Sequence, residues 1–141
     1  MRVEALVRRQ PITIGPSATL QQAARVLVQE QIGILVVTSP RTGGRAEAVL
    51  SERDLVRAVA TGTKLTSRLG SVATKKLVRV KRSERPSKAV KLMMENGIRH
   101  LVVDNDDGTL FGVLSIRDFF REKRLLESFA KEDASDVPEM N

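Results

Sequence analysis

The chain has 141 residues, of which 41% are hydrophobic and 29% are charged, with one histidine and no cysteine. This composition is typical of about one globular domain, and it excludes disulfides, thiolate catalysis, cysteine-ligated zinc and a multi-histidine metal site within one chain. The net charge of +7 favours an anionic partner, and the scarcity of aromatic residues favours phosphate capture over base stacking.

The first half of the chain begins with a predicted strand and a predicted helix. The run PITI at residues 11–14 is typical of a short strand. Apolar residues then recur at helical spacing, at Leu20, Ala23, Ala24 and Leu27. Thr19 and Gln22 stand where a capping box would close the start of this helix.

Two strands and a second helix complete the first half. The run ILVV at residues 34–37 is short and rich in valine, which predicts a buried strand. Turn-forming residues at 39–44 predict a loop. Residues 46–50 predict a second strand, which leads directly into a helix beginning at Ser51. The polar residues 61–76 are predicted to connect the two halves.

The second half repeats this order. When Ile14 is set on Val80, identical residues cluster through the helix and buried strand, and again through the strand-to-helix junction after a two-residue deletion. The pairs include Ser17/Ser83, Ala23/Ala89, Ile32/Ile98, Leu35/Leu101, Val36/Val102, Val37/Val103, Val49/Val113 and Leu50/Leu114. The second copy has predicted strands at residues 77–80, 101–104 and 109–114, and a predicted helix from Pro86 to a stop at Asn96-Gly97. Because a small sheet with helices on one side buries itself poorly, the two copies are expected to pack on each other.

The repeated junction carries the motif S-x-R-D, as Ser51-Glu52-Arg53-Asp54 and as Ser115-Ile116-Arg117-Asp118. Serine followed three residues later by an acid is an ordinary capping box. A helix start that carries a hydroxyl is also a site for an anion, and a carboxylate beside it would accept hydrogen bonds from a ribose diol. Arg53 or Arg117 could add charge for a phosphate. The capping and ligand-binding interpretations are compatible.

The duplicated β-α-β-β-α pattern resembles a tandem pair of CBS domains, also called a Bateman module. The family's nucleotide motif is matched at residues 112–118 (GVLSIRD) and at residues 48–54 (AVLSERD), where Ala48 replaces the glycine. Val36 and Val102 stand where family members often have proline. The resemblance implies an α/β (α+β) fold with two repeats related by pseudo-twofold symmetry. The predicted boundaries are 1–62 for the first repeat with its lead-in, 63–124 for the linker and second repeat, and 125–141 for a helix end and acidic tail.

The resemblance further implies that an adenosyl nucleotide, foremost AMP, binds in clefts between the repeats, with no other cofactor and no metal. The motif aspartates, Asp54 and Asp118, are expected to hold the ribose hydroxyls, and the motif serines, Ser51 and Ser115, to approach the phosphate. The positions expected near the base are Thr13 and Arg79.

Residues just before the buried strand are expected to reach the phosphate. In the second copy these are Arg99 and His100, whereas the first copy has the uncharged Gly33 and Ile34, so the resemblance implies two unequal clefts. A lone histidine before a buried strand could equally be a packed core residue. As a ligand contact, it would make phosphate affinity depend on pH.

The sequence shows no nucleophile–base pair and no phosphate-binding loop, so we expect a non-catalytic regulatory protein. The resemblance implies a homodimer, for which Leu55, Val59, Phe119 and Phe120 are candidate contacts, and an unidentified regulated protein. Two alternatives stay open. One is a nucleic-acid-binding module that uses the basic stretch at residues 75–91, and the other is a scaffold with degenerate clefts. The sequence lacks a membrane-length apolar run and a signal-peptide core, so we expect a cytoplasmic location.

Overall fold

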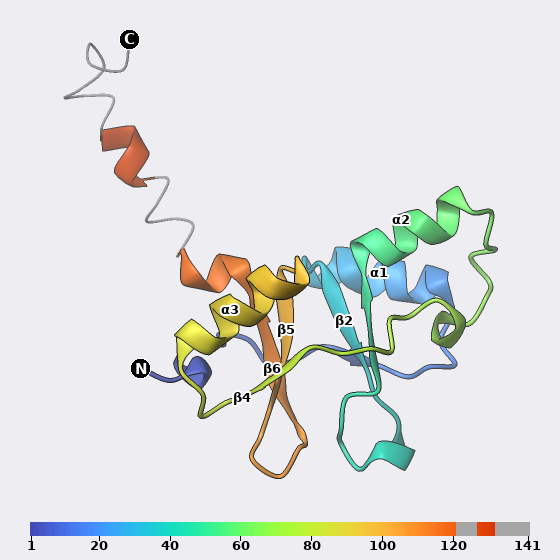
Figure 1. Ribbon diagram of the computed structural model, residues 1–141. Helices are drawn as coiled ribbons and strands as arrows, with labels where there is room; N and C mark the ends of the chain where they lie inside the picture. The colour runs from blue at the N-terminus through green and yellow to red at the C-terminus, as the bar shows by residue number, and fades with distance from the viewer. Residues whose placement is uncertain (121–126, 132–141) are drawn as a thin grey trace.

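The structure, a computed structural model, describes residues 1–120 and 127–131. Each half contains a three-stranded sheet with helices on one side, and in Figure 1 the first half lies on the right and the second half on the left. The first half comprises β1 (Thr13–Ile14), α1 (Leu20–Glu30), β2 (Ile34–Val37), β3 (Ala48–Ser51) and α2 (Glu52–Ala60). The second half comprises β4 (Arg79–Lys81), α3 (Pro86–Asn96), β5 (His100–Asp104), β6 (Leu110–Ser115) and the 3-10 helix η4 (Ile116–Phe119). The fold class expected from the duplication is therefore confirmed.

The two sheets have the same topology and equivalent registers. In each, the middle strand pairs in parallel with the first strand and antiparallel with the third. Ile34 at the start of β2 lies opposite Ser51, and His100 at the start of β5 lies opposite Ser115. The sheet register therefore places each motif serine beside the residue that was expected to approach the phosphate.

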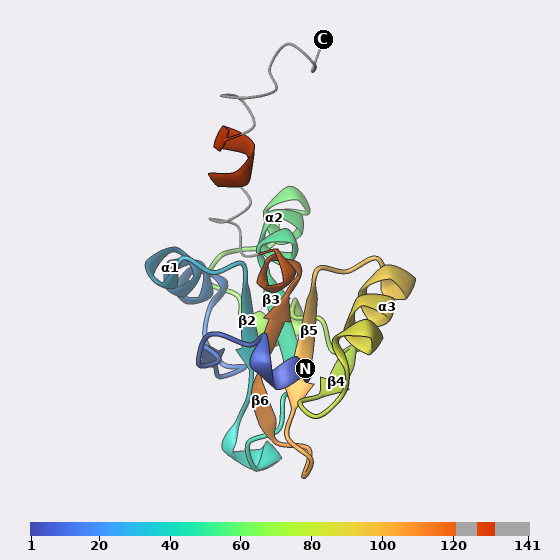
Figure 2. The same ribbon diagram turned by 90° about the vertical axis from the view of Figure 1, so that its left-hand side faces the viewer.

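Strand alternation builds three apolar clusters. On β2, Leu35 and Val37 point into the core of the first half, and on β5, Leu101 and Val103 point into the core of the second half. The intervening valines, Val36 and Val102, meet in a third cluster that joins the two halves. This two-sided burial explains why the predicted middle strands are apolar at every position except Asp104, and Figure 2 shows the two sheets side by side between the helices.

The predicted helix ends are confirmed. Thr19 and Gln22 form the reciprocal capping box of α1. Pro86 is the first residue of α3, and Gly97 ends this helix in the left-handed conformation with φ of 59°. The helix expected after Ser115 differs, because its described beginning is the short 3-10 helix η4. Residues 127–131 are helical, and the rest of the predicted tail from residue 125 lies outside the described residues.

Two short segments each pack against the half of the molecule to which they do not belong in sequence. The 3-10 helix η1 (Val3–Ala5) precedes the first repeat, but Val3 is buried in the core of the second half, and its N–H donates to the carbonyl of Glu84. The 3-10 helix η3 (Leu69–Ser71) precedes the second repeat, but Leu69 is buried in the core of the first half. The packing of these two segments therefore crosses the predicted boundary at residue 62, whereas the predicted boundary at residue 124 lies outside the described residues.

No helix in the described part of the chain is long and apolar enough to cross a membrane. Among the same residues, no group of three or more histidine, aspartate or glutamate side chains is placed to hold a metal ion.

Candidate functional site

A groove of about 1200 Å³ runs between the two halves beside both S-x-R-D motifs. Ten of the twelve sequence-predicted site residues line it. Those from the first half are Gly33, Ile34, Ser51, Arg53 and Asp54. Those from the second half are Arg99, His100, Ser115, Arg117 and Asp118. The fold therefore gathers the two repeated motifs and the residues before the buried strands around one space.

The two residues predicted near a base, Thr13 and Arg79, do not line this groove. Their neighbours Ile12 and Val78 do, because successive side chains of a strand point to opposite faces. Arg79 is instead bound elsewhere. Its Nε donates to the buried carboxylate of Asp104 at 2.8 Å, and its Nη2 donates to the carbonyl of Ala46 in the other half at 3.1 Å.

The first motif holds its aspartate in a closed hydrogen-bond network. Asp54 is 5% exposed. Its Oδ2 accepts from the N–H of Ser51 at 2.9 Å and from the Ser51 hydroxyl at 3.1 Å, and the Thr74 hydroxyl donates to its Oδ1 at 3.3 Å. Arg57 lies 3.6 Å from Oδ1. Asp54 thus acts here as the N3 carboxylate of the α2 capping box, and its acceptor sites are largely occupied.

The second motif leaves its aspartate more open. The Ser115 N–H donates to Asp118 Oδ2 at 2.7 Å, which is the one hydrogen bond to this carboxylate within the described residues. The Ser115 hydroxyl accepts from the Arg117 N–H at 3.2 Å. Partial burial raises the pKa of Asp118, while the Ser115 N–H, Arg8 and His100 act to lower it. Asp118 therefore keeps free acceptor sites toward the groove.

His100 lies at the meeting point of the two halves. Burial is the main cause that lowers its pKa from the ordinary value of 6.5. Asp118 acts in the opposite direction, as does Glu52, which reaches it from the first half. The Glu52 carboxyl group also lies over Gly33, where an added Cβ would meet it at 3.7 Å. The imidazole is thus in its neutral form at pH 7 and carries a charge only in more acidic solution.

Several groove residues were not predicted from the sequence. Six basic and three acidic side chains line the groove, namely Arg8, Arg9, Arg53, Lys76, Arg99 and Arg117 with Glu52, Asp54 and Asp118. Arg8, Arg9 and Lys76 were missed because they belong to the segments that precede the repeats. Extending the alignment of the copies toward the N-terminus, which sets residues 7–12 on residues 73–78, would have been the signal for them.

Comparison with known proteins identifies the repeats. A family model of the CBS domain matches the chain twice, at residues 3–61 and 69–124. A 17.7 kDa protein of Acidianus ambivalens is 29% identical over 120 residues, which are 85% of this chain and 71% of that protein. An inosine-5'-monophosphate dehydrogenase of Chlorobaculum parvum is 28% identical over 87% of this chain, but over only 25% of the enzyme.

A solved structure matches almost the whole chain. The CBS domain protein of Pyrobaculum aerophilum complexed with AMP superposes with a TM-score of 0.82 and 34% sequence identity. The match covers 93% of this chain and 99% of that one.

Proposed function

The chain belongs to the CBS-domain family, and from this membership we propose that it is a non-catalytic regulatory module that binds an adenine nucleotide, foremost AMP, in the groove between its halves. The observation that carries the proposal is Asp118, a partly buried carboxylate with free acceptor sites beside basic groove residues. A carboxylate so placed suits a ribose diol, while the neighbouring cations suit a phosphate.

The residues of the second motif divide the contacts. Asp118 accepts from the ribose hydroxyls, and Ser115 at the start of η4 approaches the phosphate. Arg99 and Arg117, which are exposed and form no ion pair in the described part of the chain, supply positive charge, and His100 adds to it when protonated. In the first half, Gly33 and Ile34 offer no charge, and Ser51 and Asp54 bond each other, so Arg53 is the main anion contact there.

Charge favours AMP or ADP over ATP. The six basic and three acidic groups of the groove leave an excess of three positive charges when His100 is neutral. One or two phosphates match this excess better than three do. The presence of AMP in the similar Pyrobaculum protein supports the same choice.

The output of such a module is a change of shape or assembly. A ligand that spans the groove shifts the angle between the halves only by binding one arrangement more tightly than the other. We propose a cytoplasmic homodimer that acts on an unidentified protein. Of the four predicted dimer contacts, Val59 and Phe120 are 63% and 54% exposed, whereas Leu55 and Phe119 are partly buried against the two cores.

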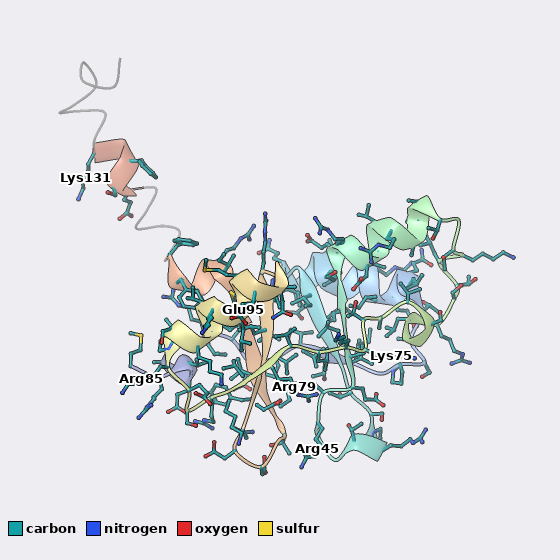
Figure 3. The ribbon with its side chains drawn as sticks, in the orientation of Figure 1. Arg45, Lys75, Arg79, Arg85, Glu95 and Lys131 are labelled. Atoms are coloured by element: carbon teal, nitrogen blue, oxygen red, sulfur yellow. The ribbon has the colours of Figure 1, made fainter. Side chains whose placement is uncertain are left out.

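The basic stretch favours nucleic acid as a second candidate. Lys75, Lys81, Arg85, Lys88 and Lys91 are exposed and form no ion pair within the described residues. Figure 3 shows Lys75, Arg79 and Arg85 spread along the segment that leads through β4 to α3. Such a surface would bind phosphodiester backbones with an affinity that falls steeply as salt rises.

Isothermal titration calorimetry of the purified protein against AMP, ADP, ATP and S-adenosylmethionine at physiological salt tests the proposal. We expect micromolar binding of AMP and at least tenfold weaker binding of ATP, since three phosphates exceed the charge that the groove can neutralise. The same titration with duplex DNA at two salt concentrations tests the second candidate. Binding of DNA without binding of any adenosyl ligand would favour the nucleic-acid candidate over the nucleotide proposal. Absence of binding to all of these ligands would favour a scaffold with degenerate clefts.

A further inference from the structure

The segments that precede the two repeats are equivalent to each other and cross to opposite halves. Residues 7–12 lead into β1, and residues 73–78 lead into β4. Val7 packs against the core of the second half, and Ala73 packs in the core of the first half. In this correspondence Arg8 is the counterpart of Thr74.

The motif glycine makes room for the first of these segments. A Cβ added to Gly112 would lie 2.7 Å from Cγ1 of Val7, closer than real contacts allow. In the first half the equivalent position is Ala48, and the residue that packs in the same core there is the smaller Ala73. The pair Gly112 and Val7 in the second half thus corresponds to the pair Ala48 and Ala73 in the first half. An alanine at position 112 would therefore force Val7 to shift, whereas the first half has a smaller residue, Ala73, in its core.

The two crossing segments place different residues beside the two motif aspartates. Thr74 donates a hydrogen bond to Asp54 and helps to close the first motif. Arg8 lines the groove near Asp118 and lowers its pKa through its charge, yet it forms no ion pair within the described residues. The adjacent Arg9 reaches across to the first half, where its Nη1 donates to the carbonyl of Glu30 at the end of α1, at 3.1 Å. Arg9 therefore fixes the segment, and Arg8 keeps a guanidinium free at the open motif.

We propose that the N-terminal segment completes the ligand site of the second half, with Arg8 binding the phosphate of the nucleotide whose ribose Asp118 holds. Val7 docked on Gly112 sets the position of Arg8. The inference rests on the proposed nucleotide-binding function and adds a phosphate contact from outside the S-x-R-D motif. It also makes the second half the anion-binding half, because the first half carries Thr74 at the corresponding place.

Binding of AMP and of adenosine to Arg8→Gln tests the phosphate contact. We expect AMP affinity to fall about tenfold, as for loss of one charge-assisted hydrogen bond, with adenosine affinity unchanged. Arg25→Gln is the matched control, because it removes the same charge from an exposed position of α1 outside the groove. Equal AMP affinity in wild type and Arg8→Gln would overturn the inference while leaving the proposed function intact. A wild type that binds no adenosyl ligand would overturn both.

Gly112→Ala, alone and combined with Val7→Ala, tests the docking step. We expect the single variant to lower AMP affinity by displacing the segment, and the double variant, whose pairing copies Ala48 with Ala73, to recover most of it. The thermal midpoint measured on the same samples should show the same order. If Gly112 instead serves close approach of the ligand, both variants lose AMP and adenosine affinity equally, and the inference fails.

Discussion

At the scale of single residues, two copies of one motif have different roles. Both serines and both aspartates form the capping boxes that the sequence predicts. Within the motif, the Ser51 hydroxyl donates to Asp54, while the Ser115 hydroxyl does not donate to Asp118. Outside the motif, Thr74 helps to occupy Asp54, while Asp118 has Arg8 nearby. Sequence reasoning could find the caps from spacing alone. It could not show which aspartate keeps free acceptor sites, since this depends on residues far away in the chain that folding brings close to each carboxylate.

His100 gives a pH prediction at this scale. Its pKa is lowered by burial, so the imidazole gains its proton only below pH 6.5 and then adds a positive charge beside the phosphate. We expect AMP affinity to rise as pH falls from 7.5 to 6, by up to about fivefold, which corresponds to about 1 kcal/mol for a solvated pair 4 Å apart.

Calorimetry at both pH values with His100→Gln alongside checks this expectation. The AMP phosphate also titrates in this range, and His100→Gln shows how much of the pH dependence of AMP affinity comes from the phosphate alone. The same pH dependence of AMP affinity in the wild type and the variant would contradict a role for His100. The stability of the ligand-free protein should change in the opposite direction from AMP affinity and decrease as pH falls. The unfolded chain binds the proton more readily, so the free energy of unfolding decreases as pH falls through 6.5 and below.

At the scale of elements, the strands and helices follow local sequence closely. The runs at 34–37 and 101–104 are strands, with β5 beginning one residue earlier at His100. As predicted, Thr19 caps the start of α1 and Gly97 caps the end of α3. The polarity of residues 61–76 predicts a connector between the halves, but it does not show that part of this connector packs in a core. Leu69 is fully buried, but the few apolar residues of this segment do not form a strand or helix pattern long enough to mark Leu69 as part of a core.

Leu69→Ala tests the structural role of this connector. We expect the free energy of unfolding to fall by about 2–5 kcal/mol, the usual cost of a cavity at a buried leucine. Leu65→Ala in the same segment is the control, since Leu65 is 44% exposed and its loss should cost within about 0.5 kcal/mol. Chemical denaturation of both variants gives the comparison. Equal, small losses would mean that the connector is a passive linker.

At the scale of the whole molecule, the duplication creates the site. Neither half contains the groove alone, because Ser51 and Asp54 line it from one side and Ser115 and Asp118 from the other. The halves are held by Val36 and Val102 in their shared cluster and by the crossing segments. The family resemblance implied clefts between the halves, and ten of the twelve residues predicted for them line the groove. The groove's asymmetry required the packing of the N-terminal segment, which pattern reasoning on the repeats alone does not provide.

Titration of AMP into wild type, Asp118→Ala and Asp54→Ala by calorimetry is the experiment that we would carry out first, with circular dichroism on each sample to verify folding. We expect one AMP per chain in the wild type, at least tenfold weaker binding in folded Asp118→Ala, and near-wild-type affinity in Asp54→Ala, with a loss of stability from breaking the α2 cap. Binding that survives in Asp118→Ala and disappears in a folded Asp54→Ala would contradict the assignment of the nucleotide to the second motif.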